Sequence, residues 1–343
     1  MPKKPPRERK PKHYDIPFRR PEEFDDALEL VVGQEDLQTK LKSVFSQYTL
    51  FLQDQTAGKP MACAYGESGS GKTFTIELLA KASGLPVTIA SAASLSPPSY
   101  KGTTIQDLLA RHWMAYHTDI GVIYLDELNK WCRYALTQGQ RDAANPEDIG
   151  NGVRSQHDLL RMVESEQINF LDLGRDIDEM QHVNFNTQNL LWIFAGSFVG
   201  LPGIIRRRLS NHHLDDEEVW GQAQPNDFIR YGMVDELAKR IRTWAWTKPL
   251  NAIDLLEILR KQEMPKWVRR GAAIGCEVIV SESAMAECAR HAFEEHLGAR
   301  GAAQLMNRSM DDIFYHLSKE HIAAYTVDHN AITTGRIELE VPA

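Results

Sequence analysis

Patterned cysteines and long apolar runs are both missing from this sequence. The four cysteines, Cys63, Cys132, Cys276 and Cys288, form no Cys-x-x-Cys pair, which argues against a zinc module and a disulfide framework and is typical of a reducing compartment. No apolar stretch reaches the roughly 18 residues that a membrane span needs, and no apolar segment follows the basic first residues. We therefore expect a cytoplasmic protein without membrane contact.

An excess of positive charge is also missing. The sequence has 39 lysines and arginines against 47 aspartates and glutamates, a formal net charge of −8, so the chain as a whole should repel nucleic acid and anionic lipid. Segment 1–20 is the exception, because it holds eight Lys or Arg residues and five prolines but few apolar side chains. It is either a solvated, disordered tail or a basic arm that docks on nucleic acid or on an acidic partner.

Short apolar runs alternate with helical patterns from Pro21 onward. Runs that are apolar on both faces predict buried strands of a parallel sheet, and amphipathic stretches between them predict helices. This order predicts a doubly wound α/β domain over residues 21–246. The expected strands are Met61–Tyr65, Val87–Ala90, Val122–Leu125 and Leu190–Ala195, and the expected helices include Phe74–Ser83, Ile105–His117 and Ser155–Glu166.

The last hundred residues have a different pattern. The strands give way to helices around Trp244 to Pro249, and 343 residues are enough for a second domain. We expect a smaller, mainly helical domain over residues 247–343. Its elements are expected at Asn251–Gln262 and Glu282–Leu297 as helices, and near Glu277–Val280 and Arg336–Val341 as short strands.

A phosphate-binding loop follows the first expected strand and opens a helix. Residues 66–73 read Gly-Glu-Ser-Gly-Ser-Gly-Lys-Thr, a pattern whose glycines let successive backbone N–H groups face the phosphates. Lys72 then reaches the β and γ phosphates of ATP, and the Thr73 hydroxyl is placed to ligate Mg²⁺. We assign the nucleotide contacts to Gly66, Ser68, Gly69, Ser70, Gly71, Lys72, Thr73 and Phe74.

Two carboxylates end a later apolar strand. Val-Ile-Tyr-Leu-Asp-Glu at 122–127 brings Asp126 and Glu127 to the sheet edge where nucleotides bind in such folds. Asp126 is expected to hold the magnesium shell. Glu127 is expected to orient and polarise the attacking water, because phosphoryl transfer depends on positioning and charge stabilisation.

Several further segments resemble the Clp and HslU class of AAA+ unfoldases, and most closely ClpX. The resemblance runs from about Pro21 to the C-terminus, with its motifs in the family's order. They are Val31-Val32-Gly33-Gln34-Glu35, the stretch from Asp227 through Glu236 to Arg240, and Gly298-Ala299-Arg300-Gly301. The resemblance implies an AAA+ large ATPase domain followed by a small lid domain.

The resemblance also assigns roles to individual residues. It implies that Val31 and Val32 pack against adenine, that Arg240 is an arginine finger acting on the neighbouring subunit's site, and that Arg300 is the sensor 2 residue near the γ phosphate. Ser197, at the end of the fourth expected strand, is the candidate for sensor 1. A finger that acts in trans implies a homo-hexamer or a spiral.

A substrate pore loop is expected at Tyr100, Lys101 and Gly102, because Ser-Tyr-Lys-Gly at 99–102 stands where ClpX has Gly-Tyr-Val-Gly. An aromatic ring beside a flexible glycine can wedge against any extended chain. Lys101 makes this loop more cationic, which suits acidic segments or phosphates. A second pore loop is expected between Ile168 and His182, around Gly174 and Arg175.

Two departures from ClpX limit what the resemblance implies. The sequence holds no cysteine-rich zinc domain, and no Ile-Gly-Phe peptidase-docking tripeptide occurs between Ser197 and Asp227. Docking to a ClpP-type peptidase is therefore not supported. We expect an ATP-hydrolysing ring that unfolds, threads or remodels protein substrates. The alternatives are a motor or loader that remodels nucleic-acid complexes and an ATP-gated assembly switch.

Overall fold

The computed structural model describes residues 15–96, 102–132, 146–164, 167–172, 181–210, 213–320 and 322–328. The chain divides into two units. The first extends to Leu28 and also takes Glu35–Glu67 and Lys72–Thr247. The second takes Glu29–Gln34, Ser68–Gly71 and the chain from Lys248 onward.

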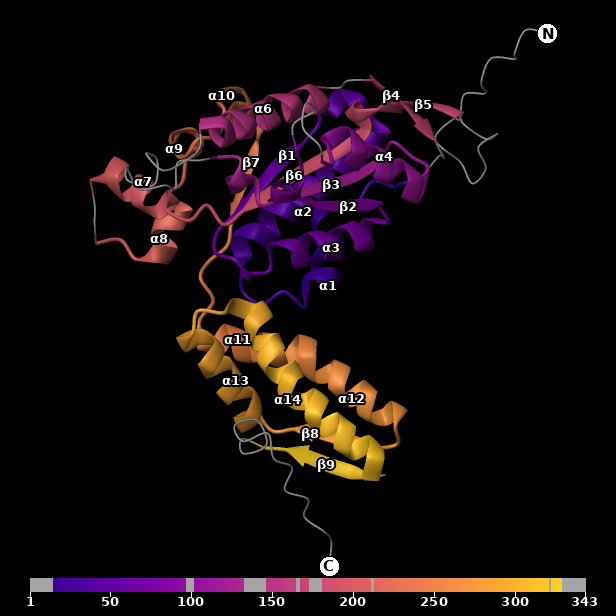
Figure 1. Cartoon of the computed structure of the whole chain (residues 1–343), viewed down its shortest axis with the longest axis vertical. Helices are drawn as coiled ribbons and strands as arrows, with labels where there is room; N and C mark the ends of the chain where they lie inside the picture. The colour runs from indigo at the N-terminus through magenta and orange to yellow at the C-terminus, as the bar shows by residue number, and fades with distance from the viewer. Residues whose placement is uncertain are drawn as a thin grey trace, which may run out of the picture. The chain divides into compact units, whose positions relative to one another are not determined.

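A five-stranded sheet forms the centre of the first unit (Figure 1). All neighbouring strands are parallel, in the order β2-β3-β6-β1-β7. The strands are β1 (Met61–Tyr65), β2 (Val87–Ser91), β3 (Gly121–Asp126), β6 (Leu190–Gly196) and β7 (Thr243–Trp246). The predicted doubly wound α/β fold is confirmed.

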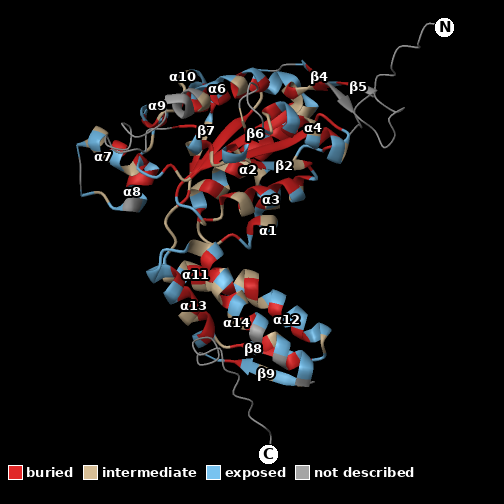
Figure 2. Ribbon diagram, viewed as in Figure 1, coloured by how far each residue is buried: buried red, intermediate tan, exposed pale blue. Residues whose placement is uncertain are grey.

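Helices cover both faces of this sheet. Figure 1 shows α1, α2 and α3 on one side and α4 and α6 on the other. Figure 2 shows that buried residues gather along the sheet and on the helix faces turned toward it. The helices are α1 (Asp25–Leu28), α2 (Glu35–Gln53), α3 (Lys72–Ser83), α4 (Ile105–Tyr116), α6 (Pro146–Val163), α7 (Leu201–Leu209), α8 (Asp216–Gly221), α9 (Pro225–Tyr231) and α10 (Asp235–Arg240).

The strands differ in burial according to their place in the sheet. Every residue of β1 and β6 is buried, as predicted. The prediction that Val87–Ala90 is buried on both faces is wrong, because β2 lies at the sheet edge and Ile89 is 41% exposed. Sequence analysis also missed β7, whose four residues are too few to show a clear period.

A second sheet was not predicted. β4 (Gln167–Asp172) pairs with β5 (Gln181–Asn186) as an antiparallel hairpin, with Asp172 opposite Gln181. The second pore loop was expected between Ile168 and His182. The ends of that range lie in β4 and β5, and Gly174 and Arg175 lie outside the described residues.

The second unit is mainly helical, as predicted. Its helices are α11 (Ala252–Ile258), α12 (Met264–Ala273), α13 (Glu282–Glu294) and α14 (Gly298–Glu320), and a π-helix over Leu259–Glu263 joins the first two. The expected strand at Glu277–Val280 is present as β8, and it pairs in parallel with β9 (Ala324–Val327). The strand expected at Arg336–Val341 lies outside the described residues.

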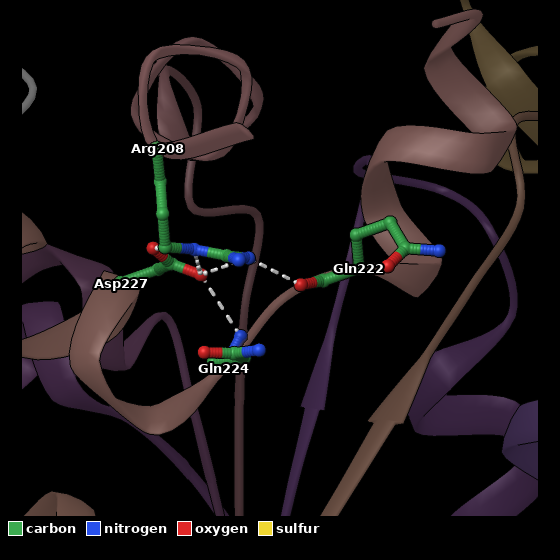
Figure 3. Close-up of polar contacts among 4 residues, drawn as sticks. All are labelled: Arg208, Gln222, Gln224 and Asp227. Carbon is green, nitrogen blue, oxygen red and sulfur yellow. Dashed lines mark hydrogen bonds and ion pairs between the residues drawn. The ribbon is translucent and has the colours of Figure 1, made fainter. Parts of the chain in front are cut away.

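A buried ion pair joins α7 to the start of α9 (Figure 3). Arg208 Nε lies 2.9 and 3.1 Å from the two carboxylate oxygens of Asp227, and Nη2 lies 3.0 Å from Oδ2. The same carboxylate accepts the backbone N–H of Gln224, and Arg208 Nη2 also donates to the Gln222 carbonyl at 2.6 Å. Because the Asp227 side chain is fully buried, these bonds replace the water that its charge has lost.

We expect Asp227→Ala to lower the free energy of unfolding by about 3 kcal/mol, because it leaves the largely buried Arg208 guanidinium without its counter-ion. The control is Asp235→Ala, which breaks the exposed pair with Lys239 and should cost less than about 1 kcal/mol. Urea unfolding of both variants measures the difference. Equal losses would contradict the role given to the buried pair.

Candidate functional site

Strand register brings the polar residues of the expected site to one edge of the sheet. Tyr65 at the end of β1 pairs with Gly196 at the end of β6, and Leu125 in β3 pairs with Phe194. Because the strands are parallel, the loops that follow β1, β3 and β6 leave from the same edge. These loops carry the phosphate-binding loop, the Asp126–Glu127 pair and Ser197.

The phosphate-binding loop has the backbone that its glycines predict. Gly66, Gly69 and Gly71 have φ angles of 132°, 76° and 94°, a region that strongly favours glycine. A Cβ atom at Gly66 would also lie 2.2 Å from Thr247 Oγ1 and 2.7 Å from its carbonyl oxygen. No larger residue fits at the first position of the loop.

Lys72 lies under this loop, and its ammonium group donates to the Gly66 carbonyl at 2.9 Å and to the Glu67 carbonyl at 2.6 Å. Its side chain is buried. Burial lowers the pKa of Lys72 to about 8, and the charges of Asp126 and Glu67 oppose that shift. A nucleotide phosphate would supply the anion that favours the charged form of this buried cation, so the residue fits the predicted role.

Hard oxygen ligands lie beside Lys72. The Thr73 hydroxyl is 3.1 Å from the Tyr124 hydroxyl, and Tyr124 lies on the same face of β3 as Asp126, two residues further on. Hydroxyl and carboxylate oxygens are the ligands that Mg²⁺ prefers, together with phosphate and water. Thr73 and Asp126 therefore fit a nucleotide-bound Mg²⁺, which would neutralise charge on the transferred phosphoryl group.

Glu127 is held by two neighbours. Its φ angle is 56°, a left-handed conformation that costs a non-glycine residue free energy, and its backbone N–H donates to Asp126 Oδ1 at 2.7 Å. Ser91 Oγ donates to Glu127 Oε2. Sequence analysis missed Ser91, whose only signal is its place at the end of β2, opposite Asp126 in the β2–β3 register.

Ser197, the sensor 1 candidate, lies at the same edge. Its backbone N–H donates to Asn129 Oδ1 at 3.2 Å, so Asn129 links the turn after Glu127 to the end of β6. A Cβ atom at Gly196 would lie 2.7 Å from this amide oxygen. Sequence analysis also missed Asn129, whose only signal is its place two residues after Glu127.

Arg240 lies near the opposite ends of the strands, where β1 and β7 begin. It ends α10, and two residues later the Arg242 N–H donates to the carbonyl of Met61, the first residue of β1. The chain's own phosphate-binding loop begins at the other end of β1, about 16 Å along a five-residue strand. The half-exposed Arg240 side chain forms an ion pair with Glu164 of the same chain.

The second unit holds the remaining expected nucleotide contacts. Val31 is buried, and Val32 packs against the core of this unit. The first turn of α14 contacts Ser68–Gly71, which belongs to the same unit, because the Ala299 N–H donates to the Gly69 carbonyl at 3.2 Å. Arg300, the next residue, is exposed.

Gln34 also belongs to this unit. Its amide exchanges two hydrogen bonds with the backbone of Lys248, at 2.8 and 3.1 Å. Sequence analysis named Gln34 only as part of the motif at residues 31–35. The structure shows that its side chain bonds to Lys248.

The expected pore loop lies largely outside the described residues. Tyr100 and Lys101 fall in the gap at 97–101, whereas Gly102 is described. The flanks of the gap are tied together, since Leu95 bridges Thr103 and the Ser96 N–H donates to the Thr103 carbonyl at 2.8 Å. The loop therefore starts and ends at one place, shortly after β2.

Among the described residues, no helix combines the length and apolar character needed to cross a membrane. That part of the chain also contains no group of three or more His, Cys, Asp or Glu side chains able to hold a metal ion.

Comparisons with known proteins agree with this geometry. Residues 62–210 match the family described as "ATPase family associated with various cellular activities (AAA)". The chain is 25% identical over 323 residues to the ATP-dependent Clp protease ATP-binding subunit ClpX of Bacteroides thetaiotaomicron, covering 87% of this chain and 77% of that protein. It is 28% identical over 316 residues to ClpX 3 of Methylococcus capsulatus, covering 82% and 71%.

We expect Lys72→Ala to weaken ATP binding by roughly ten-fold to more than a hundred-fold, since charge-assisted hydrogen bonds to phosphate contribute about 1.5–3 kcal/mol each. Titration with a fluorescent ATP analogue measures this change. Lys81→Ala, an exposed lysine on the same helix, is the control and should bind normally. Unchanged affinity of Lys72→Ala would overturn the assignment of the loop.

Proposed function

Because the chain carries an ATP-hydrolysing AAA domain and resembles ClpX over most of its length, we propose that it forms a ring that uses ATP to unfold, thread or remodel protein substrates. In this proposal each active site lies between two subunits. One subunit supplies the phosphate-binding loop, Asp126 and Glu127, and the next supplies Arg240.

The hydrolytic part of the proposal is supported by the residues gathered at one sheet edge. Lys72 and the loop N–H groups would hold the phosphates, and Glu127 would orient the attacking water and polarise it. Ser91 would position the Glu127 carboxylate by the hydrogen bond that it already makes. Ser197 and Asn129 would contribute polar contacts beside the same phosphates.

The observation that carries the proposal is the distance between Arg240 and the chain's own phosphate-binding loop. Arg242, two residues after Arg240, bonds to the first residue of β1, whereas the loop begins after the last residue of β1, about 16 Å away along the strand. An arginine that neutralises transition-state charge from this position must therefore act on another copy of the chain. This supports a ring or a spiral, with a homo-hexamer as the proposed stoichiometry.

Protein is the proposed substrate, gripped by Tyr100 next to Gly102 in the axial channel. The bridge between Leu95 and Thr103 brings the two flanks of residues 97–101 together, which supports a loop at this place. Because the loop follows β2, whose last residue Ser91 bonds to Glu127, a substrate that moves the loop could alter the position of the catalytic carboxylate.

Coupling to a peptidase is not part of the proposal. The matched relatives are named as subunits of a Clp protease, but this chain has no Ile-Gly-Phe tripeptide between Ser197 and Asp227. The apolar run at 201–205 does not replace it, because Leu201, Ile204 and Ile205 are buried on the inner face of α7.

A nucleic-acid motor is the second candidate, and two features of the sequence favour it. Segment 1–20 carries eight basic residues against Glu8 and Asp15, and Lys101 stands beside the pore tyrosine. A nucleotide-gated assembly switch is the third candidate. Stimulation of ATP turnover by unfolded protein, by DNA or by neither distinguishes the three.

Mixing two inactive variants tests the shared site. Arg240→Ala subunits keep their nucleotide site but lack the finger, and Lys72→Ala subunits keep the finger but bind ATP poorly. We expect each variant alone to have little ATPase activity and the mixture to recover part of it, because some interfaces regain both parts. Lys239→Ala, one residue away and exposed, should stay active alone. Absence of recovery in confirmed mixed rings would exclude Arg240 as the finger.

The substrate is tested with Tyr100→Ala. This change leaves every phosphate contact in place, so basal ATP hydrolysis should change by no more than a few-fold, while unfolding of a tagged fluorescent protein should be lost. If the substrate is nucleic acid, the same variant should instead lose base stacking of about 1–3 kcal/mol per base, and Lys101→Ala should weaken binding in a salt-dependent way. Equal protein unfolding by wild type and Tyr100→Ala would remove Tyr100 from the pore.

A further inference from the structure

Gln156, a fully buried residue of α6, bonds to two segments that are far apart in the sequence. Its Nε2 donates to the Trp131 carbonyl at 3.0 Å and to the Gly232 carbonyl at 3.3 Å. Its Oε1 accepts the backbone N–H of Val234 at 2.8 Å. Trp131 closes the turn that follows Glu127, and Val234 is the N-cap of α10, which ends at Arg240.

The chemistry of the three partners requires an amide at this position. Both N–H groups of Gln156 meet carbonyl oxygens, and its oxygen meets an N–H, so the reverse orientation would place like groups together. A carboxylate would set a buried negative charge against two carbonyl oxygens. A hydrocarbon side chain would leave all three backbone groups without their bond to the amide.

The packing of α6 holds this amide close to the turn after Glu127. Gly152, one helical turn before Gln156, is buried, and a Cβ atom there would lie 2.7 Å from the Trp131 carbonyl oxygen. The absence of a side chain at residue 152 therefore lets α6 reach Trp131.

The same helix also contacts the far end of α10. Glu164, which follows the last residue of α6, forms the ion pair with Arg240. Gln156 fixes where α10 begins, and Glu164 contacts the residue where it ends. Between these two contacts α10 is only six residues long, so a shift at Val234 moves Arg240 with it.

We propose that Gln156 is the positioning residue that fixes Arg240 relative to the turn after Glu127, so that each subunit's own catalytic turn sets the place of the finger it presents to its neighbour. This inference rests on the proposed function, because it requires Arg240 to act in trans. It assigns Gln156 no contact with ATP.

The proposal predicts an asymmetry between the two roles of a subunit. The turn after Glu127 keeps its own hydrogen bonds without Gln156, since the N–H groups of Lys130, Trp131 and Cys132 donate to the carbonyls of Glu127, Leu128 and Asn129. The start of α10, in contrast, loses the acceptor of its N-cap N–H. A Gln156 variant should therefore be a poor finger donor and a nearly normal acceptor.

The test places Gln156→Leu in either partner of the mixing experiment. Added to Lys72→Ala subunits, which only donate a finger, it should lower the recovered ATPase activity by roughly ten-fold to a hundred-fold, as expected for a misplaced catalytic group. Added to Arg240→Ala subunits, which only accept one, it should lower recovery no more than about two-fold. Arg154→Leu, an exposed change on the same helix, should affect neither mixture.

Val234→Pro tests the hydrogen bond between Val234 and Gln156 without a change in α6. It also provides the test if Gln156→Leu fails to fold. Val234 has a φ angle of −66°, which proline adopts, so this change chiefly removes the N–H that Gln156 accepts. It should show the same loss as a donor. Equal losses in both roles, or no loss in either, would overturn the inference. Failure of the parent mixture of Lys72→Ala with Arg240→Ala would instead overturn the trans-acting finger itself.

Discussion

The parallel register of β1, β3 and β6 is the constraint on which the site depends. Parallel strands end at the same edge of the sheet, so three loops from distant parts of the chain meet there. Their meeting follows from strand direction and needs no specific side-chain contacts between the strands. Glu127, Ser197 and the phosphate-binding loop lie together for this reason. The same register sends Arg240, which precedes β7, to the opposite edge.

Burial then determines how the polar groups at this edge behave. Lys72 is held away from water, which lowers its pKa, and its ammonium group donates to two backbone carbonyls. Asp126 and Glu127 are each engaged by a nearby donor. The result is a set of groups already oriented before a ligand arrives, which reduces the reorganisation that binding requires.

Beyond the nucleotide site, short helices are fixed by a few buried polar bonds. The Arg208–Asp227 pair secures the start of α9, and the Gln156 amide joins the end of α9 to the start of α10. Helices of six or seven residues have little stability of their own. Their positions therefore depend on these contacts and on the core beneath them, and Arg240 depends on both.

The sequence by itself determined the fold class, the phosphate-binding loop and the carboxylate pair, because each is written in contiguous residues: apolar runs, glycine spacing, and two acids at the end of a strand. It also indicated the helical second unit. Local pattern was insufficient for β7, which has only four residues and gains its hydrogen bonds from β1, far away in the chain. The β4–β5 hairpin was also missed. The same limit explains why β2 was taken as fully buried, since only strand order shows which strand lies at the edge.

Ser91, Asn129 and Gln156 carry no motif, and each acts on a residue that the fold brings to it. Only the tertiary structure could decide those contacts, because a hydrogen bond depends on distance and direction in space and not on separation along the chain.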